Sequence, residues 1–157
     1  MFGYGETIFS DDFEGYGLHD WPSVYWVADG NAESDQSKNR IELDPTGVQN
    51  QVFRLYGVEN ESYWAALTYH SCEFPNEFIL YCRVYNGSEY ILTSGHMDRA
   101  VIAMRNGTYW GNPCRRLITF NGNGKITGSG IELGTYQTER WYDVRTVSYT
   151  HLTLPTN

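Results

Sequence analysis

The sequence has 157 residues and a formal net charge of −8 at pH 7, without the clustered Lys and Arg that binding to nucleic acid or an anionic membrane requires. No apolar run is long enough to span a bilayer, and a chain of this length fits one domain. The negative charge favours neutral or cationic partners. The 13 Tyr, 7 Phe and 5 Trp favour pleated sheet over helix, which predicts an all-β protein.

The elements expected along the chain are short strands. No window of a dozen residues shows the three- and four-residue apolar spacing of an amphipathic helix. We predict strands at residues 7–10, 24–28, 40–43, 52–56, 63–69, 78–85, 90–93, 100–105, 116–121, 131–133 and 141–146, with a polar surface loop at 29–39. Many short antiparallel strands must close or stack to bury their apolar faces, which predicts a sandwich or barrel.

The clearest strand signal lies at residues 78–85, where side chains alternate between two faces. One face comprises Phe78, Leu80, Cys82 and Val84, and the other comprises Ile79, Tyr81, Arg83 and Tyr85. The run stops at Asn86-Gly87, a hairpin signal that recurs at 106–107, 121–122 and 123–124 because Asn and Gly tolerate positive φ.

The three cysteines do not define a disulfide framework. Cys82 falls among apolar strand positions, so we predict a small core residue. Cys72 and Cys114 lie in turn-rich stretches and could pair, but sequence alone does not supply the geometry that a disulfide needs.

Two segments carry a resemblance to a known fold. The first is Ile8-Phe9-Ser10-Asp11-Asp12-Phe13-Glu14-Gly15-Tyr16, followed by Trp21-Pro22-Ser23 and Tyr25-Trp26; the second is Leu133-Gly134-Thr135-Tyr136 with Glu139-Arg140-Trp141-Tyr142-Asp143-Val144-Arg145. Together they resemble the first and late strands of concanavalin A-like (laminin-G-like) jelly-roll domains. The resemblance implies an antiparallel jelly-roll β-sandwich, used as an accessory module of secreted or surface-attached proteins, alongside other domains of a larger chain.

The C-terminal residues differ in character from the rest. Residues 147–156 resemble the translation of a transposon-type sequencing adapter. We therefore expect residues 1–146 to form a partial jelly-roll domain, incomplete at the C-terminus, and residues 147–157 to be a non-native tail.

Calcium is the cofactor that the resemblance implies. Related jelly rolls often hold a structural calcium ion, and hard oxygen ligands in a loop suit this cation. We predict Asp12 and Glu14, near the first strand, and Asp143, in the late strand, as its ligands. Asp11 and Asp12 are also typical of a solvated turn.

Sugar binding is the function that the residue types favour, because aromatic rings stack on pyranose C–H groups and polar neighbours hydrogen-bond the hydroxyls. The candidate ligand-binding residues are Tyr81, Arg83, Tyr85, His96, Arg99, Tyr109 and Trp110, with Trp64 and His70 as further candidates. Trp26, Trp64 and Trp141 are interpreted as core residues rather than as ligand platforms. The predicted partner is a glycan or polysaccharide, and the predicted location is extracellular or at the cell surface.

Two other functions stay open. A structural or protein-interaction sandwich predicts buried aromatic residues and no outward aromatic–polar cluster. A polysaccharide lyase or hydrolase of the same fold predicts a groove where Arg83, His96, Arg99 and a tyrosine converge. The Glu-x-Asp-x-x-Glu run of jelly-roll glucanases is absent from the sequence, so we expect no enzyme. Arg115 and Arg116 could recognise uronic or sulfated sugars, but a solvated edge is the simpler interpretation.

Overall fold

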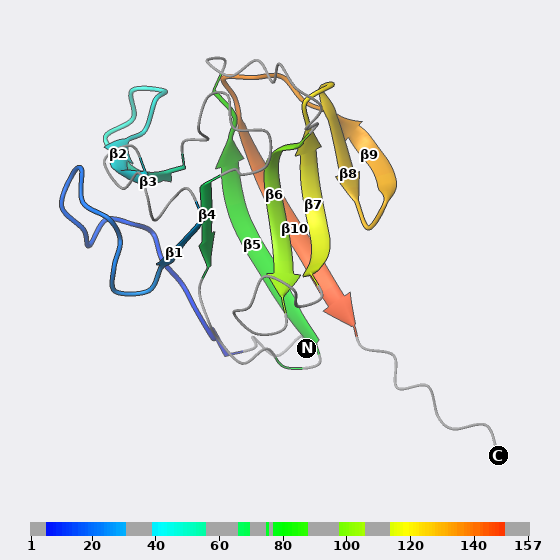
Figure 1. Ribbon diagram of the computed structural model, residues 1–157, viewed down its shortest axis with the longest axis horizontal. Helices are drawn as coiled ribbons and strands as arrows, with labels where there is room; N and C mark the ends of the chain where they lie inside the picture. The colour runs from blue at the N-terminus through cyan, green and yellow to red at the C-terminus, as the bar shows by residue number, and fades with distance from the viewer. Residues whose placement is uncertain are drawn as a thin grey trace, which may run out of the picture. The chain divides into compact units, whose positions relative to one another are not determined.

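The computed structural model describes residues 6–30, 39–55, 66–69, 75, 77–87, 98–105 and 114–149. The chain divides into two compact units, residues 1–74 and 75–157. All regular elements among the described residues are strands, and every pairing between them is antiparallel (Figure 1). The prediction of an all-β chain is thereby confirmed for these residues, and none of them forms a helix able to cross a membrane.

The first unit contains two strand pairs. Strand β1 (Val27–Gly30) pairs with β4 (Ala66–Tyr69), and β2 (Arg40–Leu43) pairs with β3 (Gln51–Arg54). The β2–β3 connection is stabilised by Asp44, whose carboxylate accepts hydrogen bonds from the backbone N–H and the hydroxyl of Thr46 at 2.8 and 2.6 Å. This arrangement is typical of a turn that opens with Asp-Pro, since an aspartate can satisfy nearby backbone donors.

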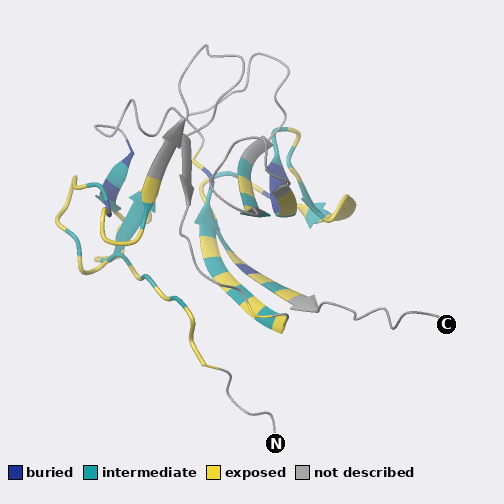
Figure 2. Cartoon of the chain, turned by 60° about the horizontal axis from the view of Figure 1, so that its bottom comes forward, coloured by how far each residue is buried: buried dark blue, intermediate teal, exposed yellow. Residues whose placement is uncertain are grey.

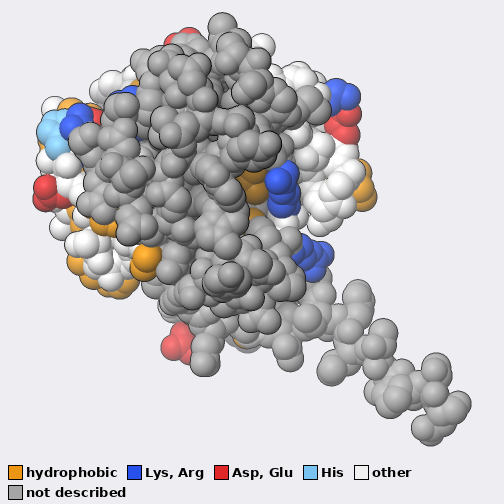
Figure 3. All heavy atoms as spheres, viewed as in Figure 1, with side chains coloured by type: hydrophobic (Ala, Val, Ile, Leu, Met, Phe, Trp, Pro, Cys, Tyr) orange, Lys and Arg blue, Asp and Glu red, His pale blue; other side chains and the backbone are white. Residues whose placement is uncertain are grey.

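One face of the β2–β3 hairpin carries an ion-pair cluster. Glu42 lies 2.7 Å from Arg40 and 3.4 Å from His19. Burial alone would raise the pKa of Glu42, but the hydrogen bond from Arg40 and the nearby positive charges outweigh it and lower that pKa. Figure 3 shows a histidine beside basic and acidic side chains in this region. The opposite face buries Ile41 completely.

The second unit contains two antiparallel sheets. Strands β6 (Asp98–Arg105), β7 (Cys114–Asn121), β8 (Lys125–Gly128) and β9 (Ile131–Thr135) form a four-stranded sheet in that order. Strands β5 (Glu77–Tyr85) and β10 (Trp141–Tyr149) form a two-stranded sheet that pairs along nine residues without a shift in register.

Side chains from both sheets meet in one hydrophobic core. Its buried members are Ile118, Phe120, Tyr136 and Val144, and the half-buried residues packed against them are Cys82, Val84, Ala100, Ile102, Ile126 and Tyr142. Phe120 is the centre of this packing, at 1% exposure and with its ring 5.3 Å from that of Tyr136 and 5.7 Å from that of Tyr142. The two sheets of this unit therefore face each other, as in a β-sandwich.

The alternation predicted for β5 is confirmed. Cys82 and Val84 pack against the core, whereas Ile79 and Tyr81 are exposed. Exposed and half-buried residues alternate along this strand in Figure 2. Cys82 is a free thiol whose pKa is raised by burial, as expected of a small core residue. Cys72 and the side chain of Cys114 lie outside the described residues.

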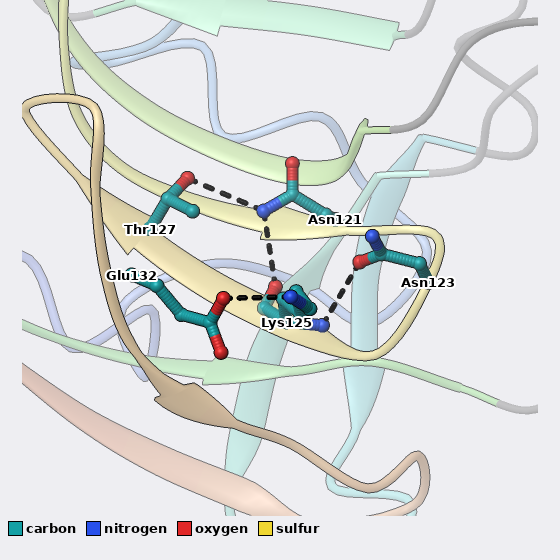
Figure 4. Close-up of polar contacts among 5 residues, drawn as sticks. All are labelled: Asn121, Asn123, Lys125, Thr127 and Glu132. Atoms are coloured by element: carbon teal, nitrogen blue, oxygen red, sulfur yellow. Dashed lines mark hydrogen bonds and ion pairs between the residues drawn. The ribbon is translucent and has the colours of Figure 1, made fainter.

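The Asn-Gly signal at residues 121–124 also forms the predicted hairpin. The N–H of Gly124 donates to the carbonyl of Asn121 at 3.0 Å, and Gly124 has φ of 83°. The amide of Asn121 donates to the carbonyl of Lys125 at 3.1 Å and to the hydroxyl of Thr127 at 3.2 Å. Figure 4 shows four polar side chains of this hairpin, Asn121, Asn123, Lys125 and Thr127, with Glu132 of β9, whose Oε2 lies 2.7 Å from Nζ of Lys125.

The strand predicted at residues 7–10 is wrong, and one observed strand was not predicted. Residues 6–10 form no strand; instead Phe9 packs edge-on against Tyr25 and Trp26, with ring centroids 5.7 and 5.8 Å away. Strand β8 was not predicted, because its four residues follow an Asn-Gly repeat and end in the first glycine of Gly128-Ser129-Gly130, and both segments are turn signals. The predicted strand at 90–93 and most of the predicted loop at 29–39 lie outside the described residues.

Strand β10 continues beyond residue 146, where the jelly-roll part was expected to end. Val147, Ser148 and Tyr149 pair with Ile79, Phe78 and Glu77 of β5. The backbone of these residues thus belongs to the sheet, while a non-native origin of residues 147–157 stays a prediction.

Candidate functional site

The outward face of β5 and β10 gathers exposed aromatic and charged side chains. We call it the β5–β10 face; from one end to the other its cross-strand pairs are Ile79 with Val147, Tyr81 with Arg145, Arg83 with Asp143, and Tyr85 with Trp141. Directly opposed residues on one face of an antiparallel pair lie close enough for their side chains to interact. The core-facing residues of both strands alternate with these positions and anchor the face to the sandwich.

Asp143 is the centre of the polar contacts on this face. Its Oδ1 accepts a hydrogen bond from the Tyr81 hydroxyl at 2.9 Å and lies 3.3 Å from Nε of Arg83. Both charged side chains stay accessible, with 50% of Arg83 and 67% of Asp143 exposed. Because the pair is solvated, its net contribution to stability is small. Its main consequence is to fix the orientation of the two side chains.

The aromatic end of the face is built around Trp141. The guanidinium carbon of Arg83 lies 4.9 Å from the centroid of the Trp141 ring, a cation–π contact, and the ring of Tyr85 lies 5.4 Å from it. Trp141 is half-buried on the outward side of β10. The sequence interpretation placed Trp141 in the core, but its position alternates with those of Tyr142 and Val144, which are the residues that point into the core.

The hydrogen bond to Asp143 affects the acid–base properties of Tyr81. The hydrogen bond, followed by a smaller desolvation effect and the charge of Asp143, raises the pKa of the phenol. Tyr81 is therefore protonated at neutral pH and acts as a hydrogen-bond donor with an exposed ring, at 62% exposure. Such a residue can bind a ligand, but it is poorly suited to act as a base.

The sequence-predicted site residues are brought together only in part. Tyr81, Arg83, Tyr85 and Asp143 share the β5–β10 face, although Asp143 was predicted as a metal ligand. Arg99 lies in β6 at a register shift, and its side chain is outside the described residues, as are His96, Tyr109, Trp110, Trp64 and His70. Sequence reasoning missed Trp141 and Arg145 as members of the face. Alternation with Tyr142 and Val144 was the signal that could have identified them.

The predicted calcium ligands of the first unit make local hydrogen bonds. Oδ1 of Asp12 accepts the N–H of Glu14 at 3.1 Å, and Oε1 of Glu14 accepts the N–H of Gln51 at 2.8 Å. Among the residues with described side chains, no three His, Cys, Asp or Glu are grouped as a metal site would require. Asp143 belongs to the second unit. Calcium binding by Asp12, Glu14 and Asp143 stays a prediction.

Asp11, next to the predicted calcium ligands, has a structural role. Its Oδ2 accepts hydrogen bonds from Trp26 Nε1 at 2.7 Å and from the Tyr16 hydroxyl at 3.0 Å, and its Oδ1 accepts the N–H of Phe13 at 2.9 Å. An open depression of about 280 Å³ lies beside it, lined by Ser10, Asp11, Asp12, Gly15, Tyr16, Val24 and Tyr25. Three donors therefore already occupy the Asp11 carboxylate at this depression.

No family model matches the sequence, and neither curated proteins nor solved structures give a significant match. The function is therefore inferred from the chemistry of the chain itself.

Proposed function

We propose that this chain is a non-catalytic carbohydrate-binding or adhesion module that binds sugars on the β5–β10 face. One observation carries the proposal: Tyr81, at 62% exposure, shares this outward face with the ion pair of Arg83 and Asp143 and donates a hydrogen bond to Asp143. A pyranose ring offers C–H groups to an aromatic ring and hydroxyls to nearby donors and acceptors. A purely structural sandwich would instead bury such aromatic residues.

Each residue has a distinct role in the proposed complex. The ring of Tyr81 stacks on the sugar, the terminal nitrogens of Arg83 donate to sugar oxygens, and Oδ2 of Asp143 accepts from sugar hydroxyls. The contacts that Asp143 and Trp141 make with Arg83 hold these groups in place before the sugar arrives. Holding side chains in the bound geometry reduces the entropy lost on binding.

The proposal includes the finer fold and the location. We assign the chain to the concanavalin A-like jelly-roll sandwiches, on the resemblance of its first and late segments and on the two facing antiparallel sheets of the second unit. Modules of this kind act outside the cell, so the proposed partner is a glycan or polysaccharide of an extracellular or cell-surface setting.

Glycan-array screening of the whole chain, followed by isothermal titration with the best ligand, tests the function. Replacement Tyr81→Ala removes the stacking ring without opening the core, so we expect a loss of affinity of about tenfold, or about 1.4 kcal/mol. Tyr25→Ala is the matched control, since Tyr25 is also an exposed tyrosine, at 48% exposure, but belongs to the first unit.

The result that contradicts this proposal is a folded protein that binds no glycan on the array, or one in which Tyr81→Ala and Tyr25→Ala weaken binding equally. The first result would favour the protein-interaction function, for which the exposed Ile79 and Val147 would be the first residues to test.

A further inference from the structure

We propose that the β5–β10 face is selective for acidic saccharides, and that Arg83 and Arg145 together receive the carboxylate or sulfate group of the sugar. This inference rests on the proposed sugar-binding function and names the class of ligand. It is argued from which charged groups of this face pair with one another and which stay available.

Arg83 is held with its terminal nitrogens available. Its Nε lies 3.3 Å from Oδ1 of Asp143, and its guanidinium carbon lies 4.9 Å from the centroid of the Trp141 ring. The Asp143 contact occupies the Nε side of the guanidinium group, and the Trp141 ring covers one face of its plane. The two terminal NH₂ groups form the remaining edge, which matches the two oxygens of a carboxylate or sulfate.

Arg145 supplies a second cation beside Arg83. It lies directly opposite Tyr81, one cross-strand pair away from Arg83 and Asp143. The Cα atoms of such diagonal neighbours are about 7 to 8 Å apart. Two long side chains at this spacing can both reach one anionic group. Arg145 is exposed and has no ion pair among the described residues.

The charge balance of the centre of this face is opposite to that of the whole chain. Arg83 and Arg145 outnumber Asp143, whose Oδ1 already accepts from Tyr81, whereas the chain carries −8. Glu77 is on the same side of β5, six residues from Arg83 and four from Tyr81, the partner of Arg145; these spacings are about 20 Å and about 13 Å at about 3.3 Å per residue. Beyond about 8 Å, physiological salt largely screens such a charge. Among the residues that the structure describes, the charges at this centre therefore favour an anionic group.

Paired ligands test this selectivity directly. Isothermal titration of the whole chain would use short oligogalacturonates and the same oligosaccharides with their carboxylates reduced to alcohols. A second pair, a sulfated oligosaccharide and its desulfated form, distinguishes the two sources of negative charge. We expect the acidic member of at least one pair to bind tenfold or more tightly, with a difference that shrinks as salt is added.

Variants assign the selectivity to these arginines. Arg145→Gln is expected to remove most of the preference for the acidic member, and Arg145→Lys to retain part of it, because the positive charge remains but the planar guanidinium group is lost. Arg115→Gln, at an exposed position of β7 that lines a depression with Val147, removes the same charge outside the Arg83–Arg145 pair and is expected to keep the full preference.

Three results would overturn the inference, and they are distinguishable from failure of the proposed function. Equal affinity for acidic and neutral members, with both weakened by Tyr81→Ala, removes the selectivity but keeps sugar binding on this face. Loss of the preference in Arg115→Gln but not in Arg145→Gln places the acidic group at another site. Absence of binding to either member by the folded chain overturns both proposals.

Discussion

Tyr81 and Asp143 are joined across β5 and β10 by a hydrogen bond of 2.9 Å between the phenol and Oδ1, although 62 residues separate them in sequence. Tyr81 stands opposite Arg145 and Asp143 stands opposite Arg83, so the bond runs diagonally between neighbouring cross-strand pairs. It couples an exposed ring to the only carboxylate in the centre of the β5–β10 face. The orientation of Tyr81 thus depends on the register of the two strands.

This hydrogen bond predicts an alkaline titration. The Asp143 carboxylate raises the pKa of Tyr81, so the phenol is expected to ionise above the ordinary value of about 10. Asp143→Asn removes the negative charge and should lower that pKa. The measurement is an NMR titration of ring-labelled tyrosine, with Tyr81→Phe to assign the signal. An unchanged Tyr81 pKa in Asp143→Asn would show that the bond is not formed in solution.

Tyr16 predicts a pH dependence of stability in the first unit. Burial, together with the hydrogen bond to Asp11, raises its pKa to about 12. A phenol whose pKa is raised on folding stabilises the native state fully below its unfolded value of about 10, and this contribution is lost as pH rises through about 12. Urea melts between pH 9 and 12 should therefore show a loss of stability that Tyr16→Phe reduces. Parallel curves for both proteins would contradict the prediction.

Because Asp11 accepts three hydrogen bonds, we predict that replacing it destabilises the protein more than replacing the neighbouring Asp12. Asp11→Ala leaves the indole N–H of Trp26 and the hydroxyl of Tyr16 without their acceptor and should destabilise the first unit by about 2 to 3 kcal/mol. Asp12→Ala removes one hydrogen bond at an exposed turn, where we expect about 0.5 kcal/mol or less. Chemical denaturation followed by tryptophan fluorescence compares the two, and equal costs would refute the assigned role of Asp11.

Gly124, in the β7–β8 hairpin, has a backbone conformation that should make its replacement by alanine destabilising. Its φ of 83° is unfavourable for residues with a Cβ, while the atom nearest to an added Cβ is the Tyr136 carbonyl at an ordinary 3.8 Å. Gly124→Ala should therefore cost about 1 to 2 kcal/mol through conformation alone. Gly87→Ala is the control, because an added Cβ there meets nothing within 4 Å. Denaturation midpoints that move equally in both variants would exclude the conformational explanation.

We predict that the packing of Phe120 is the largest single contribution to the stability of the second unit. Its ring is 1% exposed and contacts Tyr136 and Tyr142, so Phe120→Ala should cost about 3 to 5 kcal/mol and unfold much of the population at ambient temperature. Val101→Ala, at 42% exposure in β6, should cost less than about 0.5 kcal/mol. Thermal melts by near-UV circular dichroism test this contrast, which would fail if Val101→Ala were as damaging as Phe120→Ala.

The sequence by itself determined the class of fold and the faces of individual strands. Alternation within residues 78–85 separated Cys82 from Tyr81 and Arg83, and the Asn-Gly repeat placed the turn before Lys125. These features are local, because strand pleating has a period of two residues and positive φ favours Gly and Asn. The same kind of turn signal prevented the prediction of β8, because this four-residue strand lies among glycines and asparagines.

Only the tertiary structure decided which residues share the candidate site. Asp143, Trp141 and Arg145 come from a strand about 60 residues after β5, and no local pattern specifies the register at which two distant strands pair. A slip of one residue would turn Tyr142 and Val144 outward and bury Asp143. The burial of those apolar side chains against Phe120 fixes the register, and the register in turn places Asp143 beside Tyr81 and Arg83.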